Sequence, residues 1–281
     1  MSIYVSTCCL KNKNTAQVCE IFIKNKIKNI ELSYGNYNKN IVSYLLKKKK
    51  KFLLHNYFPS PKKSFVFNLA SPNIKIQKKS INLAIKAINI SKKIKSSYYS
   101  FHAGYLTDPD VSELGGKIKK KKINDKNLCL KIFLKNVNFL SKIAQKKNVK
   151  LLIENNVIHK NEFNKFSKNT VLMSEPKEII YIMKNTDKNV HLLLDVAHLK
   201  ISSNTLKFNL ISAIKKLNKW VKGYHLSENN GKIDNNKNLK YNSWFWPYIK
   251  KGLNYYSLEI YNNNINKIKN QITLTNKKIK K

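Results

Sequence analysis

The chain has 281 residues, of which 42% are hydrophobic, and its 55 basic and 15 acidic residues give a formal net charge of +40. This length suits one α/β barrel of about 250 residues better than two full domains. The apolar fraction excludes wholesale disorder, and no apolar run approaches the roughly 20 residues that cross a bilayer. The N-terminus has no basic segment before its apolar run and no clear cleavage site, which argues against a signal peptide and predicts a cytoplasmic protein.

All of the positive charge comes from lysine, because the sequence contains no arginine. Lysine, asparagine and isoleucine all abound, as in proteins encoded by A/T-rich genes, so we attribute most of the charge to composition. The alternative is that the charge favours anionic ligands such as sugar phosphates or nucleic acid, although proteins that grip phosphates usually keep arginine. The four cysteines have neither disulfide-framework nor zinc-ribbon spacing.

Eight strand-like runs alternate with stretches of helical apolar spacing. The predicted strands are Ile3–Thr7, Asn29–Ser33, Phe52–Asn56, Tyr98–His102, Val149–Asn155, Val190–Val196, Val221–Leu226 and Tyr255–Ile260. Several are continuous apolar runs, which is typical of parallel strands covered on both faces. We therefore predict an α/β protein with a single (β/α)8 barrel over residues 1–265. A doubly wound open sheet is the competing fold, but no Gly-rich phosphate loop supports it.

The segments between the strands carry further signals. Helical spacing is clearest from Leu83 to Ile94 and from Leu130 to Ala144, and Ser174 before acidic residues predicts another helix start. Residues 57–78 and 103–123 are long connections after the third and fourth strands, where a barrel builds its site. Residues 266–281 are basic and polar, which predicts a C-terminal tail with a fraying last helix.

Histidines and acids stand at the ends of the last six predicted strands. In chain order these residues are His55, His102, Glu154, Asp195 with His198 three residues later, His225 and Glu259. A barrel brings these strand ends into one ring, and imidazole with carboxylate makes a binding set for Zn²⁺, Mn²⁺, Co²⁺ or Mg²⁺. Each residue alone has an ordinary explanation, such as a helix cap. The acids together need partners, and since the chain has no arginine to pair with them, we predict a divalent metal.

His159 lies in a predicted loop, and His191 begins a strand at the other end of the barrel. Neither fits the ring, so we assign both to structural roles.

The motifs around the ring resemble those of the xylose-isomerase-like TIM barrel superfamily, which includes sugar isomerases and epimerases and the endonuclease IV type of abasic-site nuclease. The pieces similar to the nuclease are His55 with Asn68–Asn73, His102–Gly104, Ile153–Asn155, Asp195–His198, His225–Gly231 and Leu258-Glu259. They span most of the chain, and their order and strand placement are specific.

The resemblance implies a core metal bound by Glu154, Asp195, His225 and Glu259. It also implies that a nuclease of this type would hold a second metal with His55, His102 and the bridging Glu154.

A third metal of the nuclease is bound by the equivalent of His198 and an Asp-x-His pair. Here the pair reads Asp234 and Asn236, and asparagine is a poor zinc ligand compared with histidine. The Gly-rich stretch that follows in the nuclease is also missing, because this chain has Lys240–Pro247 instead. The third site, and phosphodiester cleavage with it, is therefore in doubt.

The favoured function is that of a divalent-metal-dependent isomerase or epimerase of a sugar or sugar phosphate, with a small carbohydrate as its partner. By resemblance, Glu154 and Glu259 would move a proton through an enediolate. The expected substrate-binding residues are His198, Asp234, Asn236, Trp244 and Trp246. The tryptophans would stack on a sugar ring, or else simply pack at the mouth of the barrel.

Two other functions stay open. An abasic-site phosphodiesterase with a multinuclear zinc site and nucleic acid as its partner is the alternative, and His55 and His102 favour it. A non-catalytic binding barrel is less favoured, because an intact ring of ligands is costly to keep without metal.

Overall fold

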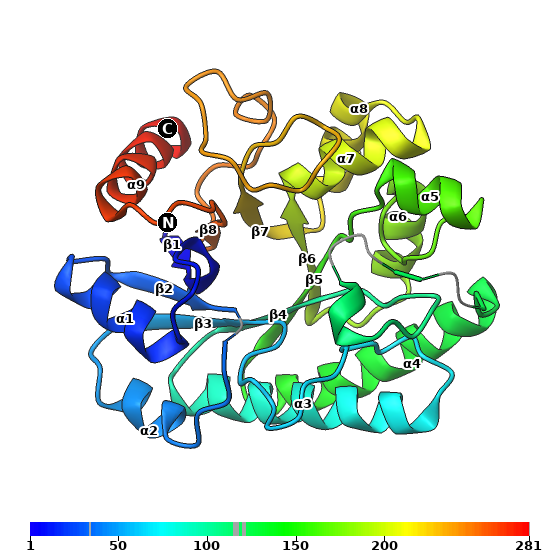
Figure 1. The fold of residues 1–281 in the computed structure, drawn as a ribbon, viewed down its shortest axis with the longest axis horizontal. Helices are drawn as coiled ribbons and strands as arrows, with labels where there is room; N and C mark the ends of the chain where they lie inside the picture. The colour runs from blue at the N-terminus through cyan, green and yellow to red at the C-terminus, as the bar shows by residue number, and fades with distance from the viewer. Residues whose placement is uncertain (34, 115–117, 120–121, 281) are drawn as a thin grey trace.

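The protein is described by a computed structural model that covers residues 1–33, 35–114, 118–119 and 122–280. Its parallel strands close into a barrel in sequence order, and β1 pairs with β8 (Figure 1). The strands are β1 (Ile3–Ser6), β2 (Asn29–Leu32), β3 (Lys51–His55), β4 (Tyr98–His102), β5 (Lys150–Glu154), β6 (Val190–Asp195), β7 (Val221–Leu226) and β8 (Tyr256–Leu258). Each overlaps a predicted strand. The single (β/α)8 barrel is confirmed, and the open sheet is excluded because its first and last strands would not pair.

Helices surround the barrel (Figure 1). They are α1 (Thr15–Lys24), α2 (Ile41–Leu46), α3 (Ile74–Lys93), α4 (Lys126–Gln145), α5 (Lys160–Phe166), α6 (Pro176–Lys184), α7 (Val196–Leu206), α8 (Leu210–Leu217) and α9 (Ile265–Ile279), with short 3-10 turns at Thr7–Cys9 and Val111–Glu113. The apolar spacing predicted for α3 and α4 corresponds to the faces that these helices bury. Among the helices of the described ranges, none combines the length and apolar character needed to span a bilayer.

Strand alternation decides what fills the barrel. Tyr4, Leu53, Leu152, Leu193 and Tyr255 form an apolar cluster separate from the larger core between strands and helices. Burying side chains of this size contributes about 1.5–3 kcal/mol each. Because side chains alternate along a strand, the residue two positions after each of Leu53, Leu152 and Leu193 faces the same interior. Those residues are the predicted site residues of β3, β5 and β6, so the apolar layer forms the floor of the site.

The start of α6 differs from the prediction. Ser174 does not cap the helix, because Glu175 is the N-cap residue and Pro176 occupies the first turn. Proline suits that position, since its fixed φ is helical and it lacks an N–H that would need a partner. Ser174 instead accepts a hydrogen bond on Oγ from Asn169 Nδ2 at 2.7 Å.

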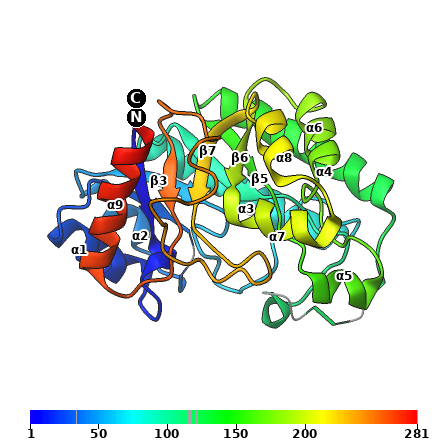
Figure 2. The same ribbon diagram turned by 90° about the horizontal axis from the view of Figure 1, so that it is seen from above.

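The stretch predicted as a basic tail from residue 266 lies largely within α9. Asn264 caps this helix by accepting from the backbone N–H groups of Asn266 and Lys267, and Ile268 and Ile279 are buried. The helix packs against β1 and lies beside α1 in both views (Figures 1 and 2). It therefore covers the seam where the barrel closes, while a domain boundary at residue 265 remains a prediction.

The two long connections lie on the side of the barrel where the strands end. The last part of the predicted connection 57–78 is helical, because α3 begins at Ile74. Of the predicted connection 103–123, residues 115–117, 120 and 121 lie outside the described part of the chain.

Candidate active site

The predicted ring residues come together at the carboxyl ends of the strands. His102 pairs in register with Glu154 on the neighbouring strand, and Asp195 pairs with His225. Glu259 follows β8 directly. Glu154 and His225 are fully buried, whereas the side chain of Glu259 is 12% exposed and that of His102 27% exposed. The ring thus has a closed floor and an open side, which faces a cavity of about 540 Å³.

Glu154, Asp195, His225 and Glu259 form a four-residue donor set. One nitrogen or oxygen atom from each lies within 4.8 Å of the others. His225 Nδ1 is 3.2 Å from Glu154 Oε1 and 3.3 Å from Glu259 Oε2. Three carboxylates with one imidazole are a mixed oxygen and nitrogen set of the kind that Mn²⁺, Co²⁺, Zn²⁺ or Mg²⁺ accepts. These four residues could hold a divalent cation.

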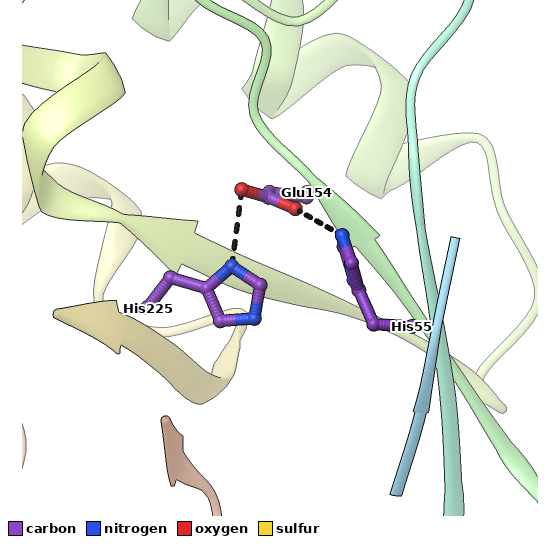
Figure 3. A group of neighbouring side chains, drawn as sticks. All are labelled: His55, Glu154 and His225. Atoms are coloured by element: carbon purple, nitrogen blue, oxygen red, sulfur yellow. Dashed lines mark hydrogen bonds and ion pairs between the residues drawn. The ribbon is translucent and has the colours of Figure 1, made fainter. Parts of the chain in front are cut away.

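Glu154 also belongs to two smaller groups. One contains His55 and His225, and the other contains His102 and His198. Glu154 Oε2 lies 3.3 Å from His55 Nε2 and 3.6 Å from His102 Nδ1, while Oε1 lies 3.3 Å from His198 Nδ1. Figure 3 shows Glu154 between the rings of His55 and His225. The structure therefore places both predicted outer histidines next to the core set.

Burial and neighbouring charges shift the pKa values of the ring residues in different directions. Burial opposes ionisation of Glu154, yet His102, His225 and His55 hold its pKa well below the usual value. Burial raises the pKa of Asp195 to about 7, despite the nearby His198. Burial lowers the pKa of His102 to about 4. The metal-free ring thus combines an ionised glutamate with an aspartate that is partly protonated at neutral pH.

Two other histidines of the ring, His225 and His198, have raised pKa values, unlike His102. Burial opposes the charged form of His225, but Glu259, Glu31 and Glu154 raise its pKa well above the usual value. Burial likewise opposes the charge on His198, but Asp195 and Asp234 outweigh it and raise the pKa of His198. These imidazolium ions occupy the place of a cation among the carboxylates. A divalent ion that binds here must displace their protons, because only a neutral imidazole is a ligand.

Glu31 is a buried acid of the site that the sequence analysis missed. It lies in β2, and its Oε2 is 3.0 Å from His225 Nε2 and accepts a hydrogen bond from the Tyr255 hydroxyl at 2.5 Å. Burial opposes its ionisation, but the charge and hydrogen bond of His225 lower its pKa to about 2. A signal was present in the sequence, because an acid between Ile30 and Leu32 in a predicted strand must face the barrel interior.

The outer part of the site contains the pair that departs from the nuclease pattern. His198 Nε2 lies 3.2 Å from Asp234 Oδ2, and Asp195 caps α7 by accepting from the His198 N–H. Within the described part of the chain, Asp234 Oδ1 and Asn236 Oδ1 are buried without a hydrogen-bond partner. His198, Asp234 and Asn236 all line the cavity.

His159, which the sequence predicts to be structural, lies at the cavity wall. It is the N-cap residue of α5, but it also lines the cavity, where burial lowers its pKa and Asp234 opposes the shift. His191, in contrast, lies near the amino end of β6, away from the ring.

Trp244 and Trp246 lie in the long connection after β7. Trp246 is 6% exposed and belongs to the main core, and its indole N–H donates to the Lys240 carbonyl at 2.9 Å. Trp244 packs edge-on against Phe245. Neither is among the described residues that line the cavity. Their position matches the packing alternative rather than a platform for a sugar ring.

The cavity wall beyond the ring is largely apolar and aromatic. Its side chains include Tyr57, Phe65, Tyr105, Val171 and Tyr261. Among the residues that the structure describes, no lysine lines the cavity, although the chain has 55 basic residues, all of them lysine. The described wall also carries polar side chains, among them Ser60, Asn156 and Glu162.

Comparisons with known proteins agree with this geometry. A family model described as "Xylose isomerase-like TIM barrel" matches residues 17–270. None of the curated proteins matches the chain in sequence.

Solved structures share the fold over nearly its whole length. A D-tagatose 3-epimerase-like protein is 17% identical, with a TM-score of 0.74 over 99% of this chain and 97% of that one. D-psicose 3-epimerase, solved in the presence of D-fructose, is 11% identical with a TM-score of 0.65 over 99% of both chains. The 3-keto-D-glucoside 4-epimerase of E. coli is 10% identical with a TM-score of 0.64 over 98% of this chain and 99% of that one. At these identities the likeness is one of fold.

Proposed function

Because the chain belongs to the xylose isomerase-like TIM barrel family, we propose that it is a divalent-metal-dependent sugar isomerase or epimerase. The observation that carries this proposal is the convergence of two glutamates, Glu154 and Glu259, on the same nitrogen, Nδ1 of His225, within one donor set. Proton transfer at a carbon next to a carbonyl needs one group to remove the proton and another to return it. The fold shared with epimerases of tagatose, psicose and a keto-glucoside supports the same chemistry.

The residues present fit a metal ion. Glu154 Oε2 is buried and accepts no hydrogen bond in the described structure, where only His55 and His102 lie near it, and three carboxylates that converge in one site favour a cation between them. Glu154, Asp195, His225 and Glu259 would hold the ion, which could be Zn²⁺, Mn²⁺, Co²⁺ or Mg²⁺. When bound, such an ion polarises a carbonyl and so acidifies the neighbouring C–H group.

The protein's own groups supply the proton transfers. Glu154 is fully buried and Glu259 is partly exposed at the cavity, so the two carboxylates would approach a bound substrate from different depths of the site. One glutamate removes the carbon-bound proton to give an enediolate, and the other returns a proton to the opposite face or to the neighbouring carbon. Glu259 Oε1 is held by the Ser6 hydroxyl at 3.4 Å and the Cys8 thiol at 3.8 Å. Hydrogen bonding to Cys9 and burial raise the pKa of Cys8, so the thiol stays a neutral donor.

The outer residues would orient the sugar. His198, Asp234 and Asn236 present hydrogen-bonding groups beside the ring, and the buried oxygens of Asp234 and Asn236 are free to accept from substrate hydroxyls. The substrate would be a sugar or a sugar phosphate, and no lysine is found among the described residues of the cavity wall. A phosphate usually requires a lysine, an arginine or a helix N-terminus. The expected cytoplasmic location remains a prediction.

An abasic-site endonuclease is the second candidate. The positions of His55 and His102 next to Glu154 favour it, because they could hold a second cation. Asn236 counts against it, since the third site then has only His198 and Asp234 as strong ligands. Losing a stabilising contribution of about 4 kcal/mol would slow phosphodiester cleavage roughly a thousandfold.

The test compares both reactions on one preparation. The Mn²⁺-loaded protein is incubated in D2O with unphosphorylated ketoses, and the loss of carbon-bound hydrogen is followed by proton NMR. We expect exchange with at least one free sugar and no meaningful incision of abasic-site DNA at moderate salt. Low salt is avoided, because a chain of +40 charge binds DNA non-specifically. Efficient incision that depends on His55, His102 and His198, without sugar exchange, would replace the proposal with the endonuclease.

A further inference from the structure

A closed network of polar contacts, which includes part of the ring of strand-end residues, lies beneath the proposed metal site. Starting from His225, Nε2 contacts Glu31 Oε2 at 3.0 Å, and the same oxygen accepts from the Tyr255 hydroxyl at 2.5 Å. The Tyr255 oxygen is 2.9 Å from Ser100 Oγ, which is 3.0 Å from His55 Nδ1. His55 Nε2 and His225 Nδ1 then return to the two oxygens of Glu154, at 3.3 and 3.2 Å (Figure 3).

Every member of this network is buried, so water does not compete for its polar contacts. Glu31, Ser100 and Tyr255 have 0% exposure, and His55 has 4%. Gly223 leaves space for Tyr255 in these contacts, because a Cβ at position 223 would lie 2.9 Å from the Tyr255 side chain. A buried hydroxyl or carboxylate keeps its partners strictly, since leaving such a group without a hydrogen bond costs about 1–3 kcal/mol.

The directions of the hydrogen bonds follow from which group can only accept. The Tyr255 hydroxyl donates to Glu31 Oε2, and the same carboxylate oxygen lies 3.0 Å from His225 Nε2, where it accepts from the imidazole N–H. The single Ser100 proton has two oxygen acceptors, the Tyr255 oxygen at 2.9 Å and the Leu54 carbonyl at 3.3 Å, and when it goes to either of them Ser100 accepts from His55 Nδ1. In this arrangement His225 Nδ1 and His55 Nε2 carry no proton when the imidazoles are neutral. Both bare nitrogens face Glu154.

We propose that Glu31 is a positioning residue for the metal site, and that it sets the tautomers of both His225 and His55, the latter through Tyr255 and Ser100. Glu31 reaches the far side of His225 from the donor set, so it acts through that histidine and does not itself bind the ion. A carboxylate behind a ligand histidine fixes the ring and makes its other nitrogen more basic. This inference rests on the proposed metal site but not on any sugar substrate.

The tautomers are tested first on the unaltered protein. With Zn²⁺ bound, ¹⁵N NMR of histidine should show a proton on Nε2 of His225 and on Nδ1 of His55. The opposite tautomer at His225 would overturn the proposal, because Glu31 would then have no N–H to accept.

The effect on metal binding is tested with Glu31→Gln and Tyr255→Phe, using calorimetric titration with Mn²⁺ and thermal unfolding without metal. Loss of a group behind a metal ligand typically weakens binding 10- to 100-fold, and we expect that range for Glu31→Gln. Tyr255→Phe should weaken binding only several-fold, since Glu31 and Ser100 remain.

Tyr256→Phe is the matched control. It removes a hydroxyl from the adjacent buried tyrosine, which donates to the Lys250 carbonyl outside the network of polar contacts. Its Mn²⁺ affinity should equal that of the unaltered protein. If Glu31→Gln and Tyr255→Phe lower thermal stability but leave the Mn²⁺ affinity unchanged, Glu31 is only structural and the proposal is wrong. If the unaltered protein binds neither Mn²⁺ nor Zn²⁺, the proposed function loses its metal site and this inference falls with it.

Discussion

The two ends of the barrel carry opposite chemistry on the same strands. β3, β5 and β7 have the exposed lysines Lys51, Lys150 and Lys222 near their amino ends. At their carboxyl ends the same strands present the buried residues His55, Glu154 and His225. These three lysines are therefore solvated at one end, whereas the other end of the same strands buries an acid and histidines together.

Histidines report this difference directly. His191, near the amino end of β6, has its pKa lowered to about 4 by burial and by Lys150 and Lys222. His225, at the carboxyl end of the next strand, has its pKa raised because three glutamates surround it. His191 is thus neutral and His225 charged, whereas His102, also at the carboxyl end, is neutral because burial lowers its pKa to about 4 despite the nearby Glu154. Net charge of the whole chain says little about the site, because the local acids decide its potential.

The largest expected effect is the loss of proton exchange when either site glutamate loses its charge. Glu154→Gln or Glu259→Gln should reduce exchange of a substrate C–H with solvent by about 10²- to 10⁴-fold, because a general base is removed. Deuterium incorporation followed by NMR measures this loss. Glu20→Gln is the matched control, since Glu20 lies on α1 and pairs with Lys48 outside the site. Unchanged exchange in both site variants would assign the proton transfers to other residues.

The next effect is the pH dependence of metal affinity. Asp195 has a pKa of about 7, and the pKa of His225 is raised as well, so at pH 6 both are protonated in the metal-free protein. Each must lose its proton to bind an ion, so Mn²⁺ affinity should fall with decreasing pH, by about tenfold per unit below pH 7 for each proton released. Calorimetry in buffers of different ionisation enthalpy counts these protons. An affinity that is flat between pH 8 and pH 6 would contradict the shifts.

Asn236→His tests the outer part of the same end. The change restores the Asp-x-His pair beside His198, and the positive φ of 42° at this position is one that histidine tolerates better than most residues. We expect an additional, weakly bound zinc ion by metal analysis, with sugar exchange altered only a few-fold. If abasic-site incision appeared with the extra zinc, Asn236 alone would separate the two activities.

The smallest effect on the site should come from the amino end. Replacing Lys51, Lys150 and Lys222 together with glutamine should leave Mn²⁺ affinity and sugar exchange within about twofold, because these side chains are exposed at the far end of the barrel. DNA retention at low salt should weaken, and the slope of log affinity against log salt should fall by about 0.9 for each phosphate that the lysines no longer neutralise. A large loss of exchange would show that the two ends are coupled.

The sequence predicted the barrel and its ring because strand order fixes where strand ends meet. The apolar runs before Glu154 and Asp195 could be assigned without tertiary information, and closure of the sheet does the rest. The sequence analysis missed Glu31 because this residue lies inside a predicted strand rather than at its end. Inside a strand, only the alternation of side chains shows which way a residue faces.

The loops were less predictable, since their path depends on contacts between distant segments. His159 lies at the cavity wall. Trp246 packs in the core, where its indole N–H donates to the Lys240 carbonyl.

The location of bound Mn²⁺ tests the central claim most directly. Anomalous scattering from crystals grown with Mn²⁺ should show an ion enclosed by Glu154, Asp195, His225 and Glu259, and the peak should disappear in Asp195→Ala. An ion bound only beside His198 and Asp234, or no ion within the ring, would contradict the account.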